Sequence, residues 1–117
     1  EKGAYQVVNW SEIKKLPKCV AVDFDGTLAV TRYPKIIRPK KYMINKIKRM
    51  KKRGWKVVLN TCRTGKELRV ATAYCAIHGL FFDAVNENLP ERISAFGGDC
   101  RKISCDIFYD DKARRVW

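Results

Sequence analysis

Short apolar segments alternate with segments of helical periodicity along this chain. Residues 19–23 (CVAVD) and 55–60 (WKVVLN) have apolar residues at successive positions, as expected of strands that are buried on both faces of a parallel sheet. Between them, apolar residues recur at helical spacing and predict a helix over residues 40–53. Residues 26–39 contain two prolines and read as an irregular flap.

The second half of the chain continues the alternation. The predicted elements are a helix over residues 64–78 that begins with a capping-box pattern (TGKE), a strand over 81–85, a helix from 88 onward and a strand over 104–109. Strands that alternate with helices indicate a single α/β domain over residues 1–117 with a parallel sheet. Residues 1–18 read as an N-terminal extension, in which residues 5–8 are a further short strand.

Charge and cysteine content narrow the class of protein. The net charge of +13 indicates a polyanionic partner such as nucleic acid, a phosphorylated substrate or an acidic protein. The five cysteines form no CxxC pair and the single His78 has no spaced partner, which argues against a zinc site. The odd number of cysteines favours reduced, buried thiols in a cytoplasmic protein. No apolar run is long enough for a membrane helix, so no membrane partner is expected.

Polar residues stand where three of the predicted strands end. Asp23 and Asp25 end the first strand, Asn60-Thr-Cys-Arg63 the second, and Asp110 and Asp111 the last. Because ligands bind at the carboxyl ends of the strands in open parallel sheets, these three clusters should meet at one edge. Crowded carboxylates of this kind suit Mg²⁺, above all where the ion also binds a phosphate.

The same residues provide the groups that phosphoryl transfer needs. One carboxylate can attack phosphorus and form an aspartyl-phosphate, and a second can protonate the leaving group and then activate water. Thr61 can donate a hydrogen bond to phosphate oxygens, and Arg63 can add a bidentate contact.

These motifs resemble those of a known family. Asp23-Phe-Asp-Gly-Thr-Leu28 looks like the first signature (DxDGT) of the haloacid dehalogenase-like (HAD) phosphohydrolases, Asn60-Thr-Cys-Arg63 their second and Tyr109-Asp-Asp111 their fourth. The resemblance covers residues 19–112 and is greatest to small bacterial and phage members. It implies a three-layer Rossmann-like fold whose parallel sheet has about four to five strands.

The resemblance also implies residue roles and a reaction. Asp23 would be the nucleophile, Asp25 the general acid and base, and Thr61 a ligand of the phosphoryl group. Asp23, Asp25 through its backbone carbonyl, and Asp110 or Asp111 would hold Mg²⁺. The expected activity is hydrolysis of phosphomonoesters, on nucleotides or on nucleic-acid ends.

The family's third signature, a Lys or Arg that neutralises the nucleophile and the phosphoryl group, has no single match. Lys102 lies in a suitable sequence but near the start of the last strand, whereas Arg92 lies early in the helix before that strand. Lys112, directly after the acidic pair, is a third candidate. Arg92 and Lys102 are therefore both predicted to contact phosphate.

The gaps between signatures leave no room for the cap domain that family members insert. By resemblance, capless members act on large substrates or close their sites as homo-oligomers. The family's usual fifth strand is missing after the acidic pair, so residues 5–8, a partner or a C-terminal part of the fold beyond Trp117 would have to supply it.

The helix over residues 40–53 carries eight cations and no acid. We expect it, extended by Arg32, Lys35 and Arg38 of the flap, to bind nucleic acid or another polyanion electrostatically, and we expect no aromatic stacking platform for single strands. The alternative function is a catalytically weak or inactive HAD-fold module that binds nucleic acid or a protein partner through this surface.

Overall fold

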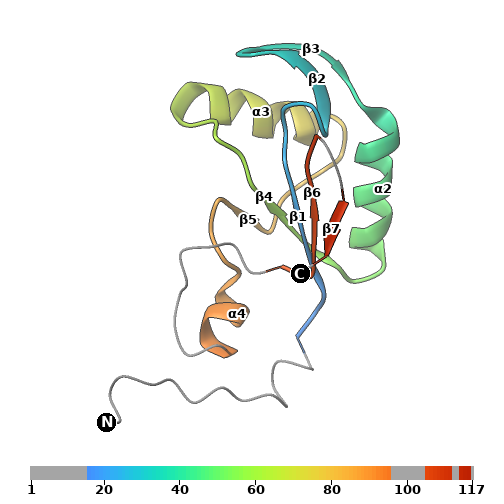
Figure 1. Cartoon of the computed structure of the whole chain (residues 1–117), viewed down its shortest axis with the longest axis vertical. Coiled ribbons are helices and arrows are strands. Elements are labelled where there is room, and N and C mark those ends of the chain that lie inside the picture. The colour runs from blue at the N-terminus through green and yellow to red at the C-terminus, as the bar shows by residue number, and fades with distance from the viewer. Residues whose placement is uncertain (1–15, 96–104, 112–113, 117) are drawn as a thin grey trace.

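The structure is a computed structural model and describes residues 16–95, 105–111 and 114–116. Figure 1 shows its elements. In chain order they are β1 (Cys19–Val22), β2 (Ala29–Arg32), β3 (Lys35–Pro39), α2 (Lys41–Lys52), β4 (Lys56–Leu59), α3 (Gly65–Ile77), β5 (Ala84–Val85), α4 (Pro90–Ala95), β6 (Ile107–Tyr109) and β7 (Arg114–Val116). The strands and helices predicted over residues 19–95 are thus found in the predicted order.

The main sheet has the strand order β5-β4-β1-β6-β7. The first four strands are parallel, and β7 pairs antiparallel with β6. The predicted α/β class with a parallel sheet is confirmed, in a Rossmann-like layout. The fifth strand is β7, which comes after the acidic pair and which we did not predict, whereas residues 5–8 lie outside the described residues.

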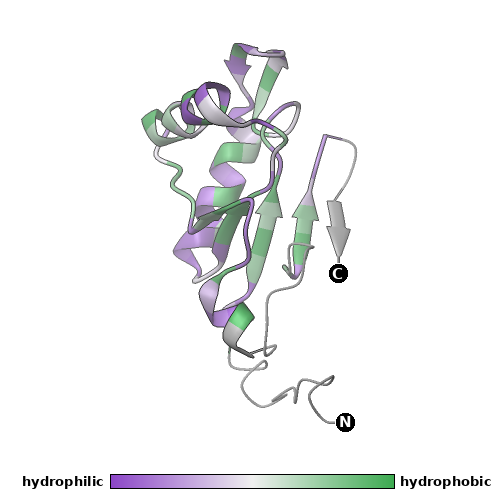
Figure 2. Cartoon of the chain, turned by 90° about the vertical axis from the view of Figure 1, so that its left-hand side faces the viewer, coloured by the Kyte–Doolittle hydropathy of each residue, from purple (hydrophilic) through white to green (hydrophobic). Residues whose placement is uncertain are grey.

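One face of this sheet packs against α2 and α3. Alternate residues of the strands point to this face, and α2 contributes Ile44 and Ile47 while α3 contributes Ala71 and Cys75. The helical spacing of these residues on α2 is the pattern from which the helix was predicted. In Figure 2 the central strands are mostly hydrophobic, in agreement with their burial on both faces.

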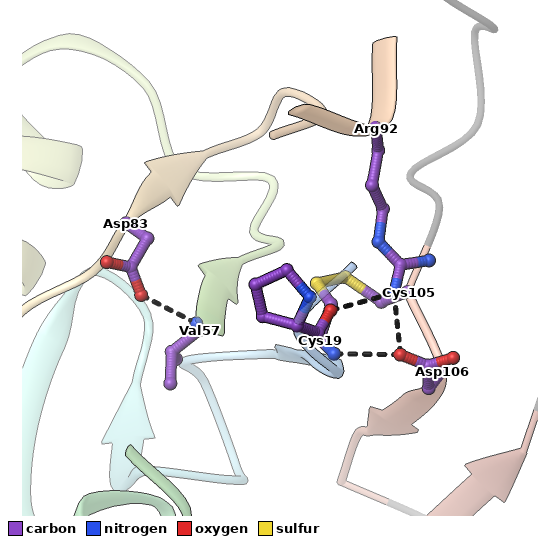
Figure 3. The surroundings of a disulfide bond; sticks show 7 residues. Cys19, Val57, Asp83, Arg92, Cys105 and Asp106 are labelled. Atoms are coloured by element: carbon purple, nitrogen blue, oxygen red, sulfur yellow. Dashed lines mark hydrogen bonds and ion pairs between the residues drawn. A yellow bond between two sulfur atoms is a disulfide. The ribbon is translucent and has the colours of Figure 1, made fainter. Parts of the chain in front are cut away.

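The opposite face carries a smaller buried cluster, made by Cys19, Ala21, Val58, Leu89 and Cys105. Cys19 and Cys105 form a disulfide with a Cα–Cα distance of 4.8 Å, which Figure 3 shows at the start of β1. The expectation of reduced thiols is therefore wrong for this pair, whose partners lie 86 residues apart.

Two further cysteines in the described part of the chain are free thiols. Cys75 is buried, and burial raises the pKa of its thiol to about 12, so it is a neutral core residue. Cys62 is exposed beside the carboxyl end of β4.

The connection from β1 to β4 contains an antiparallel hairpin followed by α2. β2 and β3 form this two-stranded sheet, where we had predicted an irregular flap. Figure 1 shows that the hairpin extends beyond the carboxyl edge of the main sheet. Most residues of β3 and the outer end of β2 are solvent-accessible, so the hairpin lacks the alternating burial that reveals a strand in a sequence. No helix among the described residues is long and apolar enough to cross a membrane.

Candidate active site

The first two carboxylates and the acidic pair meet at the point of the sheet where the order of the strands reverses. The connections from β1 lead first to β4 and β5 on one side, and the chain then returns to β6 on the other side of β1. Asp23 follows β1 and Asp110 follows β6, so both lie at the switch point where ligands bind in such sheets. A pocket of about 250 Å³ opens here, lined by Ala21, Asp23, Asn60, Thr61, Cys62, Phe108, Tyr109 and Asp110.

Asp23 is partly buried among like charges. Its Oδ1 accepts a hydrogen bond of 2.8 Å from the backbone N–H of Phe24. Burial raises the pKa of Asp23, and the negative charges of Asp25, Asp111 and Asp110 raise it further, against the opposing effect of that hydrogen bond. This environment favours the approach of a cation to the Asp23 carboxylate.

Asp25 is held by a buried arginine. Arg63 donates from Nε to Oδ2 of Asp25 at 2.9 Å and from Nη2 to Oδ1 at 2.7 Å, and its side chain is only 1% exposed. The hydroxyl of Thr31 donates to the same Oδ1 at 2.8 Å. The Arg63 contact, with the Thr31 hydrogen bond, lowers the pKa of Asp25, while Asp25 raises the pKa of Arg63.

The structure therefore gives Arg63 a different place from the predicted one. Besides Asp25, its guanidinium donates to the backbone carbonyls of Pro34 and Glu67. Its Cζ also lies 4.9 Å from the ring centroid of Phe24 and 5.0 Å from that of Tyr33. In this arrangement Arg63 orients Asp25 and does not point to the phosphate pocket. The sequence could not reveal the pair, because its partners are 38 residues apart.

Gly26 allows the loop after Asp25 to pack against the acidic pair. Its φ of +83° is in the left-handed region, and a Cβ at this position would lie 2.7 Å from the Cβ of Asp111. Lys40 donates from Nζ to the carbonyl of Gly26. The hydroxyl of Thr27, which is 4% exposed, has no hydrogen-bond partner among the described residues. Asp111 is thus brought next to the loop that carries Asp25, as predicted from the strand order.

Thr61 is positioned by a residue that we did not predict as part of the site. The N–H of Thr61 donates to Oδ1 of Asn86 at 2.7 Å, and the N–H of Asn86 donates to the carbonyl of Leu59 at 2.7 Å. Asn86 has a φ of +54°, a conformation that asparagine tolerates better than most residues. The signal in the sequence was an asparagine directly after a predicted strand. The hydroxyl of Thr61 accepts from the N–H of Arg63 at 3.1 Å.

Arg92 is not brought to this edge. Its Nη2 donates to Oδ2 of Asp106 at 2.6 Å and to the carbonyl of Pro17 at 3.4 Å, and the N–H of Cys19 donates to the same Oδ2 at 2.8 Å (Figure 3). Cys19 begins β1 and Asp23 follows its end, a separation of about 13 Å at 3.3 Å per residue. The prediction that Arg92 contacts phosphate is therefore not supported by its position.

Lys102 and Lys112 lie outside the described residues. The predicted metal ligands are described, and they supply the hard oxygen donors that Mg²⁺ prefers. Among the described residues, no three His, Cys, Asp or Glu side chains are grouped so that they could hold a metal ion. The carboxylate of Asp25 faces Arg63 and Thr31, so if Asp25 contacts an ion, its backbone carbonyl would be the donor, as the resemblance implies.

Comparison with known proteins identifies a relative of known structure. The chain is similar to a conserved protein coded by a locus of Bacteroides thetaiotaomicron, with a TM-score of 0.71 and 33% sequence identity. The match covers 84% of this chain and 78% of the Bacteroides chain. This chain belongs to the family of that conserved protein. No protein-family model and no curated protein matches the sequence.

Proposed function

We propose that this family member is a Mg²⁺-dependent phosphomonoester hydrolase of the HAD type, which acts through an aspartyl-phosphate on Asp23. The observation that supports this proposal most is the convergence of Asp23 with Asp110 and Asp111 at the switch point of a parallel sheet. Such a cluster of like charges reduces the stability of a fold, so its presence beside a pocket is expected where the charges serve chemistry.

In the proposed reaction a carboxylate oxygen of Asp23 attacks phosphorus. The bond from phosphorus to the leaving oxygen breaks, and Asp25 gives its proton to that oxygen. A water molecule then attacks the same phosphorus while Asp25 accepts a proton from it, and the Asp23 carboxylate and inorganic phosphate are released. Thr61 would hold a phosphoryl oxygen at the rim of the pocket that it shares with Asp23.

Mg²⁺ would be held by Asp23, the backbone carbonyl of Asp25, and Asp110 or Asp111. When bound, the ion supplies positive charge that offsets the repulsion between these carboxylates and the phosphoryl group. The raised pKa of Asp23, which comes first from burial and then from the charges of Asp25, Asp111 and Asp110, fits this role because a bound cation would offset both effects.

The pairing of Asp25 with Arg63 favours one of the two proton transfers over the other. Arg63 lowers the pKa of Asp25, so Asp25 is a carboxylate at neutral pH in this conformation. That form is the one that accepts a proton from water in the second step. Donation in the first step is less favoured, so we expect substrates with acidic leaving groups, such as aryl phosphates, to react faster than alkyl phosphates.

The test of this function is phosphate release by the purified protein from an aryl phosphate and from a panel of nucleotides. We expect release with Mg²⁺ and none with EDTA. Acid quenching during turnover should leave one phosphoryl group on the peptide that contains Asp23, as measured by mass spectrometry. Equal release in Mg²⁺ and EDTA, or a phosphoryl group on another peptide, would overturn the proposal.

A second function is favoured by one observation. Arg92 points away from the site, and no Lys or Arg side chain of the described residues lines the pocket around Asp23. Without the cation of the third signature, the chain would be an inactive HAD-fold module that binds nucleic acid or a protein through its basic surface. Absence of turnover on the whole panel by a folded protein, together with salt-sensitive binding that Asp23→Asn leaves intact, would favour this alternative.

A further inference from the structure

The positive charge of this protein is concentrated in one continuous segment. Residues 26–66 contain 14 Lys and Arg residues and no Asp or Glu, whereas the rest of the chain contains the other 11 cations and all 12 acids. The net charge of +13 therefore arises in the segment that forms the β2–β3 hairpin, α2 and β4. An anionic partner would be attracted to this part of the molecule.

Most cations of the hairpin and of the helix start form no ion pair with the acids that the structure describes. Arg63 pairs with Asp25 and Lys51 with Asp83, whereas Lys40 and Lys48 donate to backbone carbonyls. The remaining exposed cations form no ion pair with any described residue. Near the carboxyl edge of the sheet these are Arg32, Lys35, Arg38 and Lys41. They are available to bind phosphate groups from outside.

The hairpin is attached directly to the candidate active site. β2 begins four residues after Asp25, and Thr31 on β2 donates to the carboxylate of Asp25. At the tip of the hairpin the carbonyl of Pro34 accepts from Arg63 at 3.1 Å. A polymer bound along the hairpin would thus have its end held close to Asp25.

Tyr33 gives this basic surface an aromatic face. It lies between Arg32 and Lys35 at the hairpin tip and is 63% exposed. One face of its ring covers the guanidinium of Arg63, with 5.0 Å from Cζ to the ring centroid. Because Arg63 is itself fixed by Asp25, the Tyr33 ring is held in place with much of its surface in solvent. We expected no aromatic stacking platform on the basic surface, whereas the structure gives the hairpin an exposed aromatic ring among its cations.

An exposed aromatic ring among cations is the arrangement with which many proteins bind single-stranded nucleic acid. Cations neutralise the phosphates, and an exposed ring stacks on a base whatever its sequence. In a duplex the base faces are covered by neighbouring pairs except at the terminal pair, whereas any base of a single strand can offer its face to Tyr33. An anionic membrane surface would match the charges but would need no ring fixed beside the carboxylates.

We propose that the β2–β3 hairpin binds the end of a single-stranded nucleic acid, with Tyr33 stacked on the terminal base and the terminal phosphate directed to Asp23. The inference rests on the proposed function for the fate of that phosphate, but the binding itself requires no catalysis. It names the substrate class as single strands that end in a phosphomonoester, at either the 5′ or the 3′ end.

Binding is measured by fluorescence anisotropy with labelled single-stranded oligonucleotides that carry a 5′-phosphate, a 3′-phosphate or none. The Asp23→Asn protein is used, so that hydrolysis does not interfere. We expect Tyr33→Ala to weaken binding about tenfold and Tyr33→Phe to restore it, because stacking needs only the ring. The matched control is Phe81→Ala, which removes another exposed aromatic residue (61% exposed) outside the hairpin and should leave the affinity unchanged.

The charges are tested in the same assay. Lys35→Gln should weaken binding and reduce its dependence on salt, whereas Arg69→Gln, an exposed cation outside the acid-free segment, should have little effect. Equal effects of Tyr33→Ala and Phe81→Ala would overturn the inference, as would binding to phosphatidylserine vesicles without binding to oligonucleotides. In either case, turnover of an aryl phosphate by the wild-type protein would leave the proposed phosphatase function standing.

Discussion

The two ends of the central strand β1 hold their charges in opposite ways. At its start, the carboxylate of Asp106 accepts hydrogen bonds from the Arg92 guanidinium and from the N–H of Cys19. The negative charge of Asp106 thus faces the positive charge of the nearly buried Arg92 side chain. After its end, Asp23 is surrounded by three further carboxylates that raise its pKa. One end joins opposite charges, and the other gathers like charges.

The difference separates residues that stabilise the fold from residues that we assign to chemistry. An opposite-charge pair with good geometry is expected wherever a charge is buried for structural reasons. A like-charge cluster lowers stability and is expected where function requires it. Asp25 combines both features, because it pairs with buried Arg63 and lies beside Asp23.

The largest combined effect on rate and stability is expected for Asp25→Asn, because Asp25 both belongs to the like-charge cluster and pairs with an opposite charge. Loss of the acid and base should lower phosphate release about 10²–10⁴-fold. Loss of the carboxylate also leaves the guanidinium of Arg63 without its anion, which should lower the free energy of unfolding by about 2–4 kcal/mol. Both are measured on one preparation, by phosphate release and by urea unfolding. An active variant of unchanged stability would contradict both assignments.

A smaller effect on rate is expected for Asn86→Gly. Glycine accepts the positive φ of Asn86 but removes the acceptor for the N–H of Thr61, so Thr61 should lose its fixed position. We expect kcat/KM to fall about tenfold, as for loss of a positioning contact. Asn86→Asp, which keeps an acceptor oxygen, is the control and should retain more activity than Asn86→Gly.

At the opposite end of β1, Arg92→Gln tests the pair with Asp106. We expect the free energy of unfolding to fall by about 1–2 kcal/mol, because the carboxylate of Asp106 is partly exposed and can be solvated. The rate of phosphate release per folded molecule should stay the same. A large loss of rate with unchanged stability would place Arg92 in the third-signature role that its position argues against.

The smallest effect concerns pH. Without Mg²⁺, Asp23→Asn should raise the free energy of unfolding at about pH 7 by about 0.5–2 kcal/mol, because it removes a partly buried charge that lies among like charges. A carboxyl whose folded pKa is raised stabilises the fold below its unfolded value of 3.8 and loses this contribution as the pH rises through the folded pKa. The difference between the proteins should thus vanish as the pH falls toward 3.8 in urea unfolding. A difference that is constant with pH would show that charge is not its cause.

The elements that carry the site could be predicted because local patterns encode them. The apolar run before Asp23 and the helical spacing in α2 both reflect burial against a sheet. The β2–β3 hairpin could not be found in this way, because much of it is solvent-accessible and buries no continuous stripe. β7 was missed because it has only three residues, Arg114–Val116, which are too few to show a strand pattern.

Within the site, the sequence revealed what lies at strand ends and missed what depends on distant partners. Asp23 and Asp110 were brought together by the parallel order of β1 and β6, which the pattern predicts. The contact of Arg63 with Asp25 and that of Asn86 with Thr61 depend on side-chain directions in loops. No local periodicity specifies such directions.

The central claim is that the like charges after β1 carry out chemistry while the opposite charges before it stabilise the fold. The most direct test is the rate of phosphate release per folded molecule for Asp23→Asn beside Asp106→Asn, the same chemical change at the two ends. We predict that Asp23→Asn lowers the rate at least about 10³-fold and that Asp106→Asn leaves it unchanged. Equal rates for the two variants, or a loss confined to Asp106→Asn, would contradict the account.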